Sequence, residues 1–290
     1  MRSILQNNNR TVVYEGTSDW LKSWSFEAAV NLNQFPLMHG VTRRFGGVSK
    51  GCFSSFNLGL HVEDEIEDVW ENRKRLAKHL GVTPDVLTCG QQVHGLGVTE
   101  VTKADIGKGA FAFDAAIPNS DAIFTRLKEV PLLLMVADCV PVLLYDAAHE
   151  AVALAHAGWR GTIGHISVLT LEAMHSAYGT EPERCYAYLG PSIGPKSFEV
   201  EESLADTFRM AKAGLKRLVT YHRRPGASVM TPHIDLKGFI ADDLLNWGVP
   251  SSHITVSATD SMTNAGCYSH RRDHGHTGRM AMFAKLIKRR

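Results

Sequence analysis

The sequence predicts a globular fold that combines short buried β-strands with amphipathic α-helices. Apolar runs of strand length, each too short to cross a membrane, cover residues 130–136, 140–145 and 151–155. Shorter runs of the same kind predict further strands at residues 120–124, 185–189 and 253–257. The interior of the protein is therefore expected to be built largely from β-structure.

Helical spacing of apolar residues marks the rest of the chain. Such spacing, closed by a glycine where the chain offers one, predicts helices at residues 64–80, 163–179, 203–213 and 235–247. Residues 217–231 are expected to form a surface loop. The chain after Arg279 is expected to form a closing amphipathic helix whose basic end, 285–290, is solvated. No repeat, low-complexity tract or linker interrupts the pattern, so residues 1–290 are predicted to be one domain.

Composition excludes several classes of protein. The formal net charge of +1 offers no broad electrostatic attraction to nucleic acid or to an anionic membrane, and neither is expected as a partner. The five cysteines are odd in number and widely spaced, which argues against a disulfide framework and for a reducing compartment. The first ten residues lack the apolar core of a signal peptide. We therefore expect a cytoplasmic protein.

A thiol and an imidazole stand at the ends of the central apolar runs. Cys139 occupies the break between the runs at 130–136 and 140–145, and His156 follows the next run, just before Gly158. If the strands on either side are neighbours, both side chains reach the same edge of a sheet. A second imidazole, His94, follows another predicted strand, although spacing alone does not show whether it faces the other two.

Three chemistries fit one thiol and two imidazoles. In the first, His94, Cys139 and His156 bind zinc and leave one tetrahedral position open, as catalytic zinc sites do. In the second, Cys139 is a nucleophile, a histidine is its base and Asp138 orients that base. In the third, the same ligands hold copper, which the lack of a methionine shortly after His156 disfavours. A cysteine that is merely a small buried residue is the structural alternative.

Two segments are candidates for anion binding. Arg43 and Arg44 precede a Gly-Gly pair and Ser49, a combination that can hold an anion through guanidinium and backbone donors. An ordinary glycine hairpin with exposed arginines explains the same residues equally well. The helix expected after Gly161 directs its N-terminal amides toward His156, which also suits an anion.

Five motifs together resemble one bacterial family. They cover residues 92–95, 137–142, 155–161, 189–195, and 269–273 together with 277–279, and residues 42–49 and 71–73 also match. The family was long labelled multicopper polyphenol oxidase or laccase-like. Its members are now described as purine nucleoside phosphorylases with adenosine deaminase activity and, in one branch, as a peptidoglycan editing factor. The resemblance runs from about residue 40 to residue 290.

The resemblance implies a single α+β domain with mixed β-sheets and helices packed on the outside. It places a zinc site on His94, Cys139 and His156. It implies phosphorolysis of adenosine, inosine, guanosine or methylthioadenosine with phosphate, and deamination of adenosine. Nucleoside and phosphate are then the partners, and a homo-oligomer is left open.

If the protein is a phosphorylase, the remaining candidate residues are expected to bind phosphate or to assist departure of the base. We expect Arg43, Arg44, Ser49 and Arg160 to hold phosphate, because guanidinium groups pair well with its oxygens. We expect Asp138 or a histidine to protonate the leaving base or to hydrogen-bond to it.

Two alternative functions stay open. One is a cysteine-dependent amidase that edits a peptidoglycan precursor, and the other is a copper-dependent polyphenol oxidase. His270, His274 and His276 lie where the chain departs from the common family pattern, and no role is assigned to them.

Overall fold

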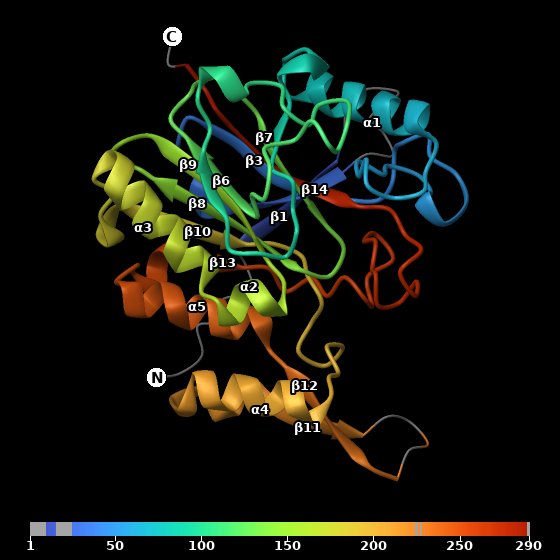
Figure 1. The fold of residues 1–290 in the computed structure, drawn as a ribbon, viewed down its shortest axis with the longest axis vertical. Coiled ribbons are helices and arrows are strands. Elements are labelled where there is room, and N and C mark those ends of the chain that lie inside the picture. The colour runs from blue at the N-terminus through green and yellow to red at the C-terminus, as the bar shows by residue number, and fades with distance from the viewer. Residues whose placement is uncertain (1–9, 16–24, 224–225, 227, 289–290) are drawn as a thin grey trace.

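Two six-stranded β-sheets form the centre of the computed structural model, which describes residues 10–15, 25–223, 226 and 228–288 (Figure 1). The first sheet has the strand order β1 (Thr11–Glu15), β2 (Ser25–Ala29), β3 (Leu37–Thr42), β14 (Met280–Leu286), β7 (Leu132–Val136) and β4 (Thr88–Cys89). The second has the order β13 (Ile254–Val256), β10 (Cys185–Leu189), β8 (Val140–Asp146), β9 (Ala151–Ala157), β6 (Ala122–Thr125) and β5 (Val98–Glu100). Both sheets are mixed, since β4 runs parallel to β7 and β5 runs parallel to β6.

The two sheets pack face to face over a shared hydrophobic core. Leu134 and Met282 of the first sheet contribute to this core together with Leu143 of the second. Successive residues of a strand point to opposite faces, so Leu133 and Phe283 lie on the outer face of the first sheet. Both faces of the central strands are buried, which explains why their sequences read as continuous apolar runs.

Helices cover the outer faces of both sheets. α1 (Ile66–His79) packs on the first sheet, and α3 (Ile166–Tyr178) and α5 (Leu236–Trp247) pack on the second (Figure 1). α3 ends at Gly179, whose φ of 74° is a left-handed conformation that suits glycine. The α+β prediction, with mixed sheets and helices on the outside, is confirmed. None of the described helices combines the length and the apolar character that a bilayer crossing requires.

A small arm projects from this layered body. It consists of α4 (Glu202–Ala211) and the antiparallel hairpin of β11 (Val219–Arg223) and β12 (Met230–Ile234), seen at the bottom of Figure 1. The prediction of a surface loop over residues 217–231 is therefore wrong. The hairpin forms because its strands pair with each other and one end is buried against α4 and α5.

The predicted C-terminal helix is also wrong. Met280–Leu286 forms β14, which lies between β3 and β7 and is buried along its whole length. Methionine, alanine, lysine and leucine all favour helices in isolation. Tertiary packing overrides that preference here, because the strand fills a gap in the first sheet and contributes side chains to the cores on both sides.

The helix expected after Gly161 begins earlier and is broken. α2 (Trp159–Ile163) includes the tryptophan and the arginine of the Gly-Trp-Arg-Gly motif, and α3 begins separately at Ile166. His165, in a left-handed conformation with φ of 57°, divides them. The first helix is thus one short turn directly after β9.

Candidate metal centre

Two chain connections cross between the sheets at one end of the structure, and both carry candidate ligands. The turn that carries Cys139 links β7 of the first sheet to β8 of the second. The loop that carries His94 links β4 of the first sheet to β5 of the second. His156 lies near the end of β9, where it pairs with Pro141 of β8. The topology therefore delivers three distant parts of the chain to one place.

The structure brings the three predicted ligands together. The distance from Cys139 Sγ to His94 Nε2 is 4.0 Å, and one ligand atom from each of the three residues lies within 4.8 Å of the other two. His156 is buried, Cys139 is half-buried and His94 is exposed. The imidazole rings of His94 and His156 are tilted by 71° at a centroid separation of 4.8 Å. The sulfur is therefore open to a ligand rather than sealed in hydrocarbon.

Glycine is required where the chain passes the thiol. A Cβ atom at Gly158 would lie 3.0 Å from Cys139 Sγ and 3.4 Å from His94 Cδ2. The first of these distances is tighter than ordinary van der Waals contact. The glycine thus lets β9 turn into α2 without pushing apart two of the candidate ligands.

Charge couples the thiol to the imidazoles. Burial alone would raise the pKa of the Cys139 thiol, but His156 and then His94 outweigh it and lower that pKa to about 6. Burial likewise opposes charge on His156, whereas the Cys139 thiolate and the Asp121 carboxylate raise its pKa to about 9. The site therefore favours a thiolate that lies beside a positive charge. A bound divalent cation would supply such a charge at the same place.

A cavity of about 290 Å³ opens over the three ligands. Two guanidinium groups, Arg271 and Arg279, contribute to its wall, together with the imidazole of His61. Burial, and then the nearby charges of Arg279 and Arg73, lower the pKa of His61 to about 4, so its ring is neutral near pH 7. The rest of the lining includes Gln92, Met135, Asp138, Ile193, Phe198 and His270.

A larger pocket of about 950 Å³ adjoins this cavity. Phe198 and Arg271 line both, so the two pockets lie side by side. Trp159 at the start of α2 and Leu204 of α4 supply apolar walls to the larger pocket. His274 lines this pocket and His270 lines the smaller cavity, whereas His276 is in neither lining.

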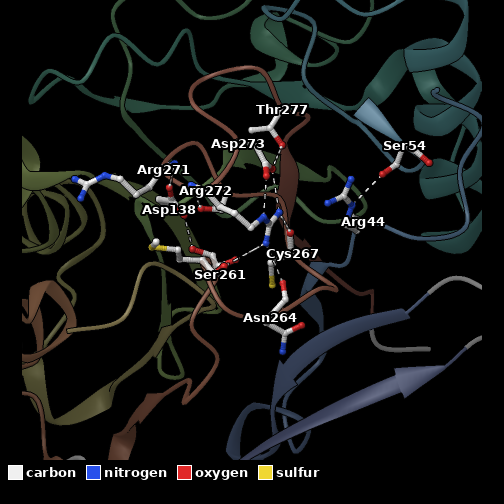
Figure 2. Close-up of polar contacts among 12 residues, drawn as sticks. Arg44, Ser54, Asp138, Ser261, Asn264, Cys267, Arg271, Arg272, Asp273 and Thr277 are labelled. Carbon is white, nitrogen blue, oxygen red and sulfur yellow. Dashed lines mark hydrogen bonds and ion pairs between the residues drawn. The ribbon is translucent and has the colours of Figure 1, made fainter. Parts of the chain in front are cut away.

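The residues predicted to hold phosphate lie outside both linings. Arg43 donates a hydrogen bond to the Asn264 side chain at 2.9 Å. Arg44 donates to the backbone carbonyl of Ser54 (Figure 2). Its guanidinium group also lies over the Tyr268 ring.

The other two members of that set also have partners of their own. Ser49 is buried and accepts a hydrogen bond from Asn72. Arg160 is exposed and lies over the ring of Trp159. A phosphate role for these four residues stays a prediction, and the guanidinium groups that line the cavity are Arg271 and Arg279.

Asp138 joins the site to the C-terminal loop, which comprises residues 257–279 between β13 and β14. It is buried, its φ is 87°, and its carboxylate accepts hydrogen bonds from Ser261 Oγ and from the backbone amide of Arg271 (Figure 2). Arg272 ties the same loop together through the backbone carbonyls of Ser261, Met262, Asn264 and Cys267 and through the carboxylate of Asp273 (Figure 2). The loop that carries Arg271 is therefore held firmly beside the cavity.

Comparison with known proteins identifies the family. Residues 38–287 match the family described as multi-copper polyphenol oxidoreductase laccase. The chain belongs to this family. The resemblance predicted from the sequence is thereby confirmed for this laccase-like family.

Relatives within the laccase-like family bear a different functional name. The chain is 40% identical over 245 residues to purine nucleoside phosphorylase YlmD of Geobacillus stearothermophilus, covering 84% of this chain and 88% of the relative. It is 38% identical over 251 residues to a purine nucleoside phosphorylase of Deinococcus radiodurans, covering 87% and 90%.

Solved structures agree with the assignment of the fold and of the family. The crystal structure of YlmD from Geobacillus stearothermophilus superposes with a TM-score of 0.85 at 36% identity, covering 94% of this chain and 99% of that one. That of the hypothetical protein YfiH from Bacillus licheniformis gives a TM-score of 0.84 at 31% identity, covering 91% and 96%.

Sequence reasoning overlooked several residues of the site. Asp121, directly before β6, accepts a hydrogen bond from His156 Nδ1, and nothing in its local sequence marks that role. Gln92 exchanges two hydrogen bonds with the backbone of Met135 and so ties the His94 loop to the end of β7. His61 reaches the cavity from a turn before α1. Only the convergence of distant segments shows that these residues belong together.

Proposed function

We propose that this protein is a zinc-dependent purine nucleoside phosphorylase that also deaminates adenosine. The observation that supports it most directly is a His-Cys-His ligand set that opens into a cavity containing two guanidinium groups. Relatives at 38–40% identity are named purine nucleoside phosphorylases. The proposed substrates are adenosine, inosine, guanosine and methylthioadenosine, with phosphate.

The donor set fits zinc. Two imidazole nitrogens and one thiolate are ligands that Zn²⁺ prefers, and three protein ligands leave a position open toward the cavity. A zinc ion held by His94, Cys139 and His156 would supply Lewis-acid chemistry at that open position. His156 lies in the paired strand β9, Cys139 lies in the short turn between β7 and β8, and the His94 amide is held by the Asp121 carboxylate, so the three ligands come from separate segments that are each anchored.

Phosphate is placed by the cavity arginines in this proposal. Arg271 and Arg279 both line the cavity, and guanidinium groups pair phosphate oxygens in a bidentate manner. Arg279 is largely desolvated, which lowers its pKa and strengthens any charge interaction that it makes with an anion. Its Nη1 donates to the backbone carbonyls of Thr277 and Gly278, and these contacts hold the group in position.

Phosphorolysis requires one bond to form and one to break. A phosphate oxygen bonds to C1′ of the ribose while the bond from C1′ to the purine nitrogen breaks, and the electron pair of that bond stays on the base. The neutral imidazole of His61 can hydrogen-bond to the substrate, and Asp138 lines the same cavity. The departing purine is planar and largely apolar, which suits the adjoining pocket beside Trp159 and Phe198.

One observation favours the amidase alternative. Cys139 Sγ is half-buried and lies 4.0 Å from a histidine nitrogen, an arrangement that also fits a thiol nucleophile with its base. The polyphenol oxidase alternative fits less well. A multicopper centre needs several ligand groups, whereas the described residues contain a single group of three or more histidine, cysteine or acidic side chains at metal-binding distance.

The decisive experiment measures base release from inosine by the zinc-loaded protein, with and without phosphate. We expect release to depend on phosphate and to yield ribose 1-phosphate. Release of free ribose at a rate independent of phosphate would contradict the proposal. Ammonia release from adenosine tests the deaminase part, and its absence would remove that part alone.

Variants and a thiol reagent separate the alternatives. Arg279→Met should raise the KM for phosphate, whereas Arg126→Met, an exposed arginine over Tyr178, should not. Removal of zinc should abolish phosphorolysis. A metal-free protein that cleaves a muropeptide amide and is inactivated by alkylation of Cys139 would favour the amidase.

A further inference from the structure

The Asp121 side chain holds two of the candidate ligands at once. It is fully buried directly before β6, and each of its two oxygens accepts two hydrogen bonds. Oδ1 accepts from the backbone amide of His94 at 3.0 Å and from His156 Nδ1 at 2.9 Å. Oδ2 accepts from the backbone amides of Val93 at 3.1 Å and Gly95 at 2.7 Å.

These four contacts saturate the carboxylate. An ionised carboxylate has about four lone-pair positions and no proton to donate, and each position here faces an N–H group. Three of the four partners are backbone amides, which can only donate, so both oxygens act as acceptors and the side chain is a carboxylate. An acceptor-only partner requires His156 Nδ1 to carry the proton. In the neutral imidazole, which is the form that binds a metal ion, Nε2 is then the ring nitrogen that keeps the lone pair.

We infer that Asp121 is the positioning residue of the metal centre: it selects the His156 tautomer whose Nε2 binds the ion and fixes the loop that presents His94. The inference rests on the proposed metal site. A partner that donated a hydrogen bond to Nδ1 would occupy the lone pair of that nitrogen. The ring proton would then sit on Nε2, where it would prevent binding of the ion. Main-chain bonds reinforce the link, since the His156 amide donates to the Asp121 carbonyl at 2.8 Å.

Asparagine is the informative substitution at this position. Asp121→Asn keeps the size of the side chain but replaces one acceptor oxygen with an NH₂ group. Whichever way the amide is turned, that group faces N–H donors, either two backbone amides or a backbone amide and the imidazole. Loss of an outer-shell partner typically weakens metal binding about 10- to 100-fold.

The chain offers a matched control in Asp146. This aspartate is also fully buried, and it also accepts four hydrogen bonds, one of them from a histidine Nδ1. Its histidine, His149, belongs to the turn between β8 and β9, at the other end of β8 from Cys139. Asp146→Asn therefore disturbs a similar network without touching the candidate ligands.

The test compares zinc affinity by competition with a chromophoric chelator in the wild-type protein and in both variants. We expect Asp121→Asn to bind zinc about 10- to 100-fold more weakly and Asp146→Asn to bind it as the wild type does, while both unfold at lower temperature. Unchanged affinity in Asp121→Asn, or an equal loss in both variants, would overturn the inference.

A second measurement does not depend on the fold of any variant. In the zinc-loaded wild type, ¹⁵N NMR of histidine should show the proton of His156 on Nδ1, and a proton on Nε2 would overturn the inference. A wild-type protein that binds no zinc would overturn both this inference and the zinc part of the proposed function. Zinc binding that depends on Asp121 in a protein without phosphorolysis would leave the inference standing and remove only the activity.

Discussion

Asp138 and Arg271 are joined by a 2.7 Å hydrogen bond in which the Asp138 carboxylate accepts from the Arg271 backbone amide. The bond connects the turn that carries Cys139 to the loop whose guanidinium group lines both pockets. Ser261 Oγ donates to the other oxygen of the same carboxylate at 2.5 Å. The catalytic role predicted for Asp138 from the sequence stays a prediction, whereas its contacts show that it anchors a wall of the cavity.

Asp138→Asn should lower kcat/KM for the nucleoside while zinc content stays unchanged. The amide places an NH₂ group opposite one of the two present donors, and a buried donor left without its partner costs about 1–3 kcal/mol. The measurement pairs steady-state kinetics with metal analysis. Ser261→Ala, which removes one donor only, should have a smaller effect, and loss of zinc in Asp138→Asn would contradict this role.

Gly158→Ala should weaken metal binding without unfolding the protein. The added methyl group would lie 3.0 Å from Cys139 Sγ, so the thiol or the turn must shift. Gly214→Ala is the matched control, because a Cβ atom at Gly214 would meet nothing within 4 Å. Zinc competition assays on both variants check the prediction, and equal affinities would show that the turn can absorb the methyl group.

Acid should destabilise the protein through His39. This residue lies in β3, is 4% exposed, and burial lowers its pKa from 6.5 to about 4 despite its hydrogen bond to the Ala29 carbonyl. At a pH between these two pKa values, His39 is protonated in the unfolded chain and neutral in the folded chain. The stabilisation is therefore complete above pH 6.5 and is lost as the pH falls toward 4.

The size of this effect follows from the shift. At 1.36 kcal/mol per pKa unit, His39 accounts for at most about 3 kcal/mol of unfolding free energy over that range. His39→Gln stays neutral and should flatten the pH dependence, as measured by urea unfolding at several pH values. His61 shifts in the same direction, so some slope should remain. An unchanged slope would show that folding does not lower the pKa of His39.

Arg272→Met should loosen the C-terminal loop. The guanidinium group donates to four backbone carbonyls and pairs with Asp273, and hydrogen bonds from a charged group are worth about 1.5–3 kcal/mol each. Hydrogen exchange should accelerate over residues 261–277, and kcat/KM should fall because Arg271 is carried by this loop. Arg209→Met, which removes exposed ion pairs on α4, should leave this exchange unchanged.

Part of the fold could be predicted from local pattern. The apolar runs at 130–136, 140–145 and 151–155 coincide with the strands at 132–136, 140–146 and 151–157, because burial on both faces leaves a continuous apolar signal. β14 could not be recognised in this way, because its residues also favour a helix and only the gap between β3 and β7 makes it a strand. Residues 217–231 lacked a clear alternation, so their hairpin was missed.

The sequence by itself determined which chemical groups are available: a thiol at a strand break, imidazoles beside glycines, and motifs specific enough to assign the laccase-like family. Only the tertiary structure decided which of these groups act together. Asp121, Arg271 and Arg279 reach the centre because two connections cross between the sheets and the C-terminal loop folds back over them. Contacts between residues so far apart in the chain leave no mark on local spacing, because they depend on how the sheets are stacked.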